Sequence, residues 1–174
     1  SALSRVVGQA ASTFPLRVTA GAQLDEVDQF RFSHPGIKAS LQSTAPRLLE
    51  SVAQPSYGSF DVTISPEVPP GVYEARARGR FGLSNPRSFL VTSAPVQYVE
   101  QEHSTLETAL DLSVQQVTVD RFLPQKRNYY RLALNQKQNF RIVAHAHKLD
   151  SRAIVALTLI NPQGQEVARG RTIG

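Results

Sequence analysis

Cysteine, methionine and tryptophan are absent from the sequence. Without cysteine the chain has no disulfide bonds and no thiolate chemistry, and the redox compartment cannot be inferred from it. The aromatic residues are eight Phe and five Tyr, which predicts cores built mainly from aliphatic side chains. No apolar run approaches the ~20 residues of a membrane-spanning helix, and no charged leader followed by an apolar stretch opens the chain. Because the first residue is not Met, we expect a piece of a longer protein.

Neither positive nor negative charge is concentrated in one segment of the sequence. The net charge of +5 is spread along the chain without a block of like charges, whereas nucleic-acid-binding proteins usually gather theirs on one face or segment. The sequence therefore argues against nucleic acid as a partner. With 174 residues, of which 41% are hydrophobic, the chain is long enough for two packed modules.

The stretch from Pro69 to Phe89 organises the first module. Pro70 and Gly71 close a turn, because proline presets φ and glycine tolerates unusual backbone angles. From Val72 to Arg80 small or aromatic residues alternate with charged ones, the period-2 pattern of a half-buried strand. Arg87 to Thr92 is then expected to return antiparallel to this strand.

The start of this strand also carries a fold signal. Gly71, Tyr73 and Ala75 stand at alternate positions, as in the tyrosine corner of immunoglobulin-like sandwiches, where the tyrosine hydroxyl bonds to upstream backbone. Ala75 occupies the position of the cysteine in antibody domains. We therefore predict structural roles for Tyr73, Gly71 and Pro70.

Similar alternation predicts about seven short strands in the first module, enough for one sandwich. Residues 43–54 do not fit this pattern: Leu48, Leu49 and Val52 have helical spacing, but flanking prolines also suit a loop or a single turn. The strands are expected in residues 1–8, 14–19, 29–33, 37–41, 58–65, 72–80 and 87–92. We assign residues 1–94 to this first sandwich.

A change of composition predicts a linker at residues 95–104, followed by a second all-β module at residues 105–174. One helical turn at residues 105–110 precedes its strands. Asn161 to Gly164 forms the turn of a hairpin between the last two. The strands are expected in residues 114–119, 129–134, 140–147, 153–160 and 166–169.

These are about five strands, fewer than the seven or eight of a complete sandwich. A half-built sandwich leaves apolar faces and strand edges uncovered. We therefore expect another protein chain, or a downstream segment, to complete this module by pairing with the strand near residues 153–160 or 166–169.

Several blocks of sequence together carry a family resemblance. In the first module they are Phe30–Ile37, Val68–Arg76 and Gly79–Arg87, and in the second Glu100–Glu102, Asn128–Leu132 and Leu157–Ala168. The chain resembles secreted planctomycete-type bacterial proteins in which an immunoglobulin-like (IPT/TIG-like) module precedes a pre-peptidase C-terminal domain.

The resemblance implies an all-β fold of two tandem antiparallel β-sandwiches, the first immunoglobulin-like and the second jelly-roll-like and incomplete. It also implies a location that is secreted or in the cell envelope. The second domain of this family sometimes binds Ca²⁺ through acidic loops. Here the corresponding positions hold Glu102, His103 and Ser104, and then Lys126, Arg127 and Asn128. Because two cations would repel Ca²⁺, we expect no metal site and no cofactor.

The candidate binding site is a stripe of arginines on the outward face of the strand at residues 72–80. Its members Arg76, Arg78 and Arg80 would span about 13 Å along the strand, a spacing that suits the sulfates or carboxylates of an extracellular polysaccharide. Arg87 on the returning strand would extend the stripe. The alternative is an exposed sheet face whose arginines keep the edge soluble.

No catalytic constellation accompanies these features. His145 and His147 would share one strand face but have no third metal ligand nearby, and His34 suits a turn in which its ring caps a backbone group. Glu100 and Glu102 have no identifiable partner for acid–base chemistry. We therefore predict a non-enzymatic accessory segment, serving as a spacer, adhesion or assembly module. The alternative is a binding module for a polysaccharide or another polyanion.

Overall fold

The computed structural model describes residues 2–19, 26–46, 52–123, 126–134, 139 and 141–171. The chain divides into two compact units, which are considered separately. The first comprises Ser1–Val99 with Val114–Asp120, and the second comprises Glu100–Ser113 with Arg121–Gly174. Within the described ranges the secondary structure is almost all β, with one short 3₁₀ helix. The predicted all-β class is therefore confirmed.

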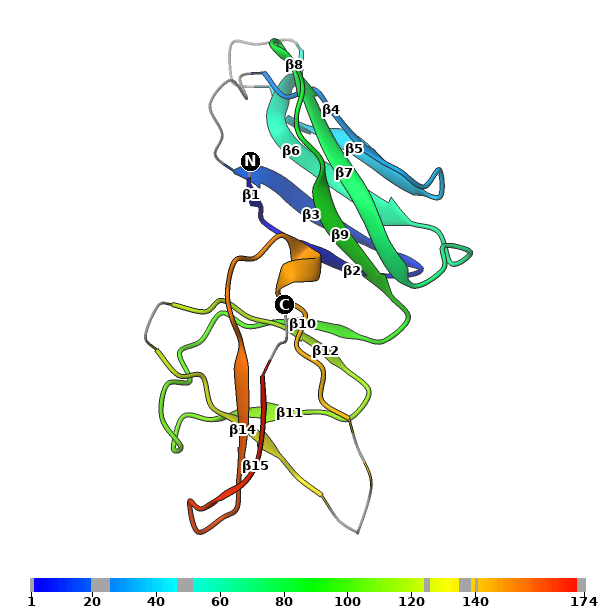
Figure 1. Cartoon of the computed structure of the whole chain (residues 1–174). Coiled ribbons are helices and arrows are strands. Elements are labelled where there is room, and N and C mark those ends of the chain that lie inside the picture. Colours follow the sequence, from blue (N-terminus) through cyan, green and yellow to red (C-terminus); the bar gives the residue numbers. More distant parts are fainter. Residues whose placement is uncertain are drawn as a thin grey trace. The chain divides into compact units, whose positions relative to one another are not determined.

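Two sheets form the body of the first unit (Figure 1). One has the strand order β1-β3-β6-β5, and the other has the order β2-β9-β7-β4, with the short β8 paired to β7. Their bounds are β1 Ala2–Leu3, β2 Val7–Gln9, β3 Ser12–Thr19, β4 Gln29–Phe32, β5 Ile37–Thr44, β6 Gln54–Ile64, β7 Gly71–Gly79, β8 Gly82–Leu83 and β9 Arg87–Thr92.

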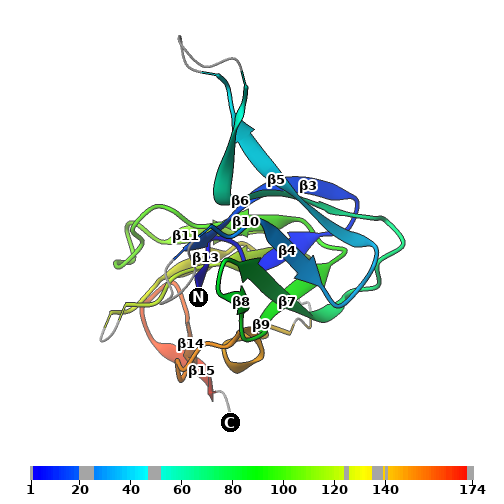
Figure 2. The same cartoon turned by 90° about the horizontal axis from the view of Figure 1, so that it is seen from above.

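The strand order can be compared with that of an immunoglobulin-type sandwich. In such domains strands A, B, E and D form one sheet and C, F and G the other. Here β1, β3, β6 and β5 take the first set of places, and β4, β7 and β9 take the second. Strand β2 runs parallel to β9 at the edge of the second sheet. Seen from above, β3, β5 and β6 lie in one layer, and β4, β7 and β9 lie in the other (Figure 2).

The core lies between these sheets and follows the alternation of the strands. Phe14 and Leu16 are buried on β3, Phe60 and Val62 on β6, and Phe89 and Val91 on β9. Ring centroids of Phe30 and Phe60 are 5.6 Å apart, and those of Phe32 and Phe89 are 5.0 Å apart. Burial of these side chains, about 1.5–3 kcal/mol each, is the main force that holds the two sheets together.

The predicted tyrosine corner is present at the start of β7. The Tyr73 hydroxyl donates a hydrogen bond of 2.7 Å to the backbone oxygen of Pro69. The ring is half-buried rather than fully buried, and it packs edge-on against His34 with 5.3 Å between centroids. His34 in turn accepts a hydrogen bond at Nδ1 from the backbone N–H of Gly36, so its ring caps the turn as expected. These contacts tie the turn before β7 to the turn after β4.

The structure describes residues 43–46 and 52–54 of the segment for which the sequence left helix and loop open. Strand β5 continues to Thr44 and β6 begins at Gln54, and these two residues pair across the strands. The ends of the segment are therefore extended rather than helical. Leu48 and Leu49 lie outside the described residues.

A further strand pair belongs to the first unit. Strand β10 (Val96–Tyr98) runs parallel to β12 (Val117–Val119), so part of the predicted linker at residues 95–104 is a strand of this unit. The Tyr98 hydroxyl donates to the backbone oxygen of Val7 at 2.7 Å and accepts from its N–H at 3.0 Å. Both backbone groups of one β2 residue are thus bonded to a single side chain.

The second unit holds two separate strand pairs among its described residues. Strand β11 (Leu110–Leu112) is parallel to β13 (Tyr130–Leu132), and β14 (Ala156–Ile160) is antiparallel to β15 (Glu166–Arg171). The hairpin predicted around Asn161–Gly164 is confirmed: Asn161 Oδ1 accepts from the backbone N–H groups of Gln163 and Gln165.

The strand predicted at residues 140–147 is wrong. Residues 141–146 adopt no regular structure, and a 3₁₀ helix follows at His147–Leu149. Phe140 and the turn predicted at residues 135–138 lie outside the described residues. At residues 105–110 a turn closed by Thr105 and Thr108 takes the place of a helical turn. Completion of this unit by another segment stays a prediction. In the described part of the chain no helix is long and apolar enough to span a membrane.

The tyrosine corner can be tested by removing one atom. Replacement Tyr73→Phe deletes the hydrogen bond to Pro69 and leaves the ring, so the free energy of unfolding in urea should fall by about 1 kcal/mol. The matched control is Tyr57→Phe, because the Tyr57 side chain is 52% exposed and makes no comparable contact in the described structure. Equal losses in the two variants would contradict a stabilising corner bond.

Candidate functional site

The arginine stripe lies on β7, and its geometry follows from the alternation of that strand. Ala75 and Ala77 are buried, Tyr73 is half-buried, and all three face the core. Glu74, Arg76 and Arg78 therefore project from the opposite, outward face.

Strand β4 extends this outward surface. The register places Gln29 opposite Arg78 and Arg31 opposite Arg76, while Phe30 faces the core. The Arg31 guanidinium donates to Gln29 Oε1 at 3.0 Å, and that of Arg78 reaches the same oxygen at 3.5 Å. We call this surface the arginine face and define it by its residues Gln29, Arg31, Glu74, Arg76 and Arg78.

The arginine face carries an excess of positive charge. Its carboxylate, Glu74, lies 3.2 Å from the Arg76 guanidinium, with side-chain exposures of 61% and 38%. At such exposure an ion pair contributes about 1 kcal/mol or less. Arg31 and Arg76 are directly opposed like charges, an arrangement that destabilises a sheet. Three guanidiniums therefore share this solvent-facing surface with one carboxylate, which contacts Arg76.

Arg80 and Arg87 do not join this face. Arg80 lies in the turn after β7, beside the exposed Phe81. Arg87 pairs with the buried Ala75, so its side chain leaves the sheet on the core side. Within the described ranges its Nε is a buried polar atom without a hydrogen-bond partner. The prediction that Arg87 extends the stripe is wrong.

A one-residue change of register explains the position of Arg87. Arg78 pairs with Leu83 in β8, and continuation of that register would set Arg87 opposite Glu74, on the outward face. Between β8 and β9 the chain gains one residue around Asn85 and Pro86, so Ala75 rather than Glu74 meets Arg87. A slip of one residue moves a side chain to the other face.

Sequence reasoning missed Arg31 and Gln29. The alternation of Arg31 with two phenylalanines marked it as an outward residue. Which strand would lie beside β4, however, depends on the pairing of segments far apart in the chain. Only the fold brings Arg31 to Arg76.

Comparison with known proteins adds little. No family model matches the chain. No curated protein matches it either. A solved structure of Bacteroides ovatus SGBP-B, from a mixed-linkage glucan utilization locus and in complex with mixed-linkage heptasaccharide, is similar to 55% of this chain and 22% of that chain. The sequence identity is 15% and the TM-score 0.34. At a score this low the likeness is partial.

The histidines considered as metal ligands are not held together by a strand. His145 lies in irregular structure and His147 in the 3₁₀ helix, both exposed. Among the described residues no three His, Asp or Glu side chains form a group that suits a metal ion.

A lysine stands where the family resemblance suggested calcium ligands. Lys126 Nζ lies 3.2 Å from Glu102 Oε1, which also accepts a hydrogen bond from Ser104 Oγ. The hydrogen bond from Lys126, followed by that from Ser104 and by the lysine charge, lowers the pKa of the Glu102 carboxyl. Lys126 therefore supplies a cation of the protein itself to this loop. His103, which lies between Glu102 and Ser104 in the sequence, is buried with its ring 5.0 Å from that of Tyr130.

The pairing of Glu102 with Lys126 can be tested by titration. Replacement Lys126→Met should raise the pKa of Glu102 toward its ordinary value, measured by NMR of the carboxyl carbon, whereas Lys38→Met should not. Because the folded pKa is the lower one, any stabilisation by the pair is present above the unfolded pKa and is lost as the pH falls through the folded pKa.

Millimolar Ca²⁺ should leave the Tm of the unmodified protein unchanged. A rise of several degrees would contradict the absence of a calcium site.

Proposed function

We propose that the first unit binds an anionic polysaccharide through the arginine face, as a non-enzymatic accessory module of a secreted or cell-envelope bacterial protein. The observation that carries this proposal is the cross-strand pair Arg31 and Arg76 with Arg78 beside it. Three guanidiniums on one sheet face are held together against their mutual repulsion, and a bound polyanion would relieve it. The location and the bacterial origin rest on the family resemblance alone.

The spacing of the face suits a repeating anionic chain. Side chains two residues apart on a strand are separated by about 6.6–6.8 Å, and directly opposed residues have Cβ atoms about 4.5–5.5 Å apart. A planar guanidinium matches the two oxygens of a carboxylate or sulfate in a bidentate pair. Carboxylates or sulfates on successive sugars can therefore meet successive arginines.

Exposed aliphatic side chains flank the arginines. Val72 is 48% exposed and precedes Glu74 on the outward face of β7, and Leu83 is 57% exposed and pairs with Arg78. They offer apolar surface to the C–H groups of a sugar ring. The five residues of the arginine face include no aromatic ring, so stacking of nucleic-acid bases is not favoured.

A second candidate function is purely structural, and the position of β4 supports it. Strand β4 is at the end of its sheet order, and charged residues on an edge strand discourage pairing with other proteins. In that case Arg31 and Arg76 keep a spacer module soluble and bind no ligand.

The two candidates differ in how variants bind immobilised polysaccharides. With heparin as the sulfated probe and polygalacturonate as the carboxylated one, R31A and R76A should each weaken binding about tenfold, through loss of a charge-assisted contact. Glu74→Gln should strengthen binding, because it removes the carboxylate that occupies Arg76. Binding should also fall as salt is raised.

The matched control is Arg17→Ala, which removes the same charge from an exposed position of β3 in the other sheet. If R17A weakens binding as much as R76A does, general charge rather than the arginine face would be responsible. Failure of the unmodified protein to bind either probe would leave the structural function in its place.

A further inference from the structure

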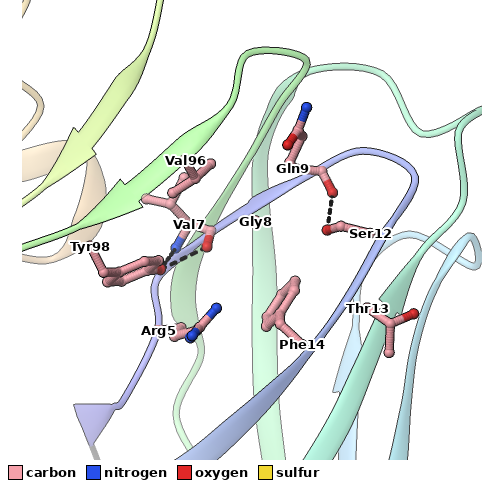
Figure 3. Close-up of a pocket in the computed structure, with 9 residues that line it drawn as sticks. All are labelled: Arg5, Val7, Gly8, Gln9, Ser12, Thr13, Phe14, Val96 and Tyr98. Atoms are coloured by element: carbon pink, nitrogen blue, oxygen red, sulfur yellow. Dashed lines mark hydrogen bonds between the residues drawn. The ribbon is translucent and has the colours of Figure 1, made fainter. Parts of the chain in front are cut away.

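A pocket in the first unit lies apart from the arginine face and shares no residue with it (Figure 3). It has a volume of about 170 Å³ and opens between β2, the beginning of β3 and β10. Pockets for drug-sized ligands begin at about 300 Å³. This pocket therefore suits one small molecule, or one residue at the end of a longer chain.

The backbone of β2 comes unusually close to the core at this place. A Cβ atom added at Gly8 would lie 2.6 Å from Ile64 Cδ1 and 2.8 Å from Phe14 Cε1. Glycine alone permits this approach without displacement of those side chains. The Phe14 ring and Val96 form the apolar wall of the pocket.

Arg5 supplies the charge of the pocket. Its guanidinium carbon lies 4.9 Å from the centroid of the Tyr98 ring and 5.6 Å from that of Phe14, within the range of cation–π attraction. Figure 3 shows the guanidinium between these two rings. The rings hold the cation but offer no strong hydrogen-bond acceptor, so its five N–H donors are not satisfied by them.

Tyr98 does not neutralise this charge. Its hydroxyl is bonded to both backbone groups of Val7. Burial raises the pKa of Tyr98, against weaker opposing effects from the Val7 hydrogen bond and the Arg5 charge. The phenol therefore stays protonated and neutral near pH 7.

Among the described residues no carboxylate neutralises it either. In this part of the chain the interactions of Arg5 are the cation–π contacts with the two rings. Arg5 is half-buried, so its charge is only partly hydrated. As far as the described residues go, the pocket is thus a cationic site without a counter-charge.

The polar side of the pocket consists mainly of acceptors. The Ser12 hydroxyl donates its proton to the backbone oxygen of Gln9 at 2.5 Å, which leaves Ser12 Oγ with its lone pairs. Gln9 Nε2 donates to the Ser93 backbone oxygen at 3.3 Å, and no donor to Gln9 Oε1 is present among the described residues. A ligand that fits would carry hydroxyl donors as well as a negative charge.

We propose that this pocket binds a small hydroxycarboxylate of the sugar-acid class, with its carboxylate on Arg5, its hydroxyls on Gln9 and Ser12, and its C–H face on Phe14 and Val96. The acid is either a free molecule or the end residue of a polysaccharide. Both present the same chemistry to the pocket.

The test uses three probes with the whole chain: D-galacturonate, D-galactose, which lacks the carboxylate, and acetate, which lacks the hydroxyls. Galacturonate should shift the backbone amide NMR signals of Gly8, Gln9 and Val96, and should bind at least about tenfold more tightly than the other two. Equal binding of galactose or acetate, or no shift of these amides, would overturn the proposal.

Two variants test the role of Arg5. Arg5→Gln should weaken galacturonate binding at least about tenfold. Gln9→Glu should do the same, because it adds a negative charge to the pocket lining that repels the carboxylate of the ligand. It retains the cation–π contacts in case the first variant fails to fold. Unchanged affinity in a folded Arg5→Gln or Gln9→Glu protein would overturn the proposal.

A control separates this pocket from other charges. Arg17→Gln should leave galacturonate affinity unchanged, and a loss in this variant would overturn the assignment to Arg5. Galacturonate oligomers distinguish the source of the ligand. When followed at the amide signals of Gly8, Gln9 and Val96, binding of oligomers at least as tight as that of the monomer indicates a chain end, and binding of the monomer alone indicates a free acid. Either result supports the chemistry of the pocket.

Discussion

Burial of apolar side chains between the two sheets of the first unit is the interaction on which the rest of the structure depends. Leu16, Phe60 and Phe89 are almost completely inaccessible to solvent, and no disulfide assists them because the chain has no cysteine. Strands have a period of two, so an inward set of side chains determines the outward set as well. The arginine face is therefore held in place by the core behind it. A change of register that exposed Ala75 and Ala77 would bury Arg76.

Interruptions of the regular pattern decide which charged groups reach solvent. The extra residue near Asn85 and Pro86 turns Arg87 away from the other arginines, and the missing side chain at Gly8 brings the backbone of β2 onto Phe14. Tyr98 then bonds to Val7 and lies against Arg5. The two candidate sites thus depend on different features of the structure. The arginine face depends on the regular alternation of β7, and the pocket at Arg5 depends on the close approach of the β2 backbone to Phe14, which only glycine allows.

The two units differ in how their apolar residues are used. Among the described residues, thirteen buried side chains form one cluster in the first unit. The described residues of the second unit that are buried are Leu110, Ala146, Val155 and His103, while Ile154 and Val167 are strongly exposed. Exposed apolar groups beside short strand pairs are the reason to expect a further segment against this unit. The first unit carries both candidate sites because its framework is the better packed one.

The sequence by itself determined what depends on neighbours along the chain. Alternation predicted most strands of the first unit, the turn residues predicted the Asn161–Gly164 hairpin, and the spacing of Gly71 and Tyr73 predicted the corner bond to Pro69. The prediction from sequence failed at residues 140–147, because alternation along one segment does not form a strand unless a partner strand pairs with it. Only the tertiary structure decided that Arg31 lies opposite Arg76, that Arg87 faces inward, and that Arg5 meets Phe14 and Tyr98. The reason is physical: pairing and register between distant segments are decided by the packing of the whole core, which no local pattern contains.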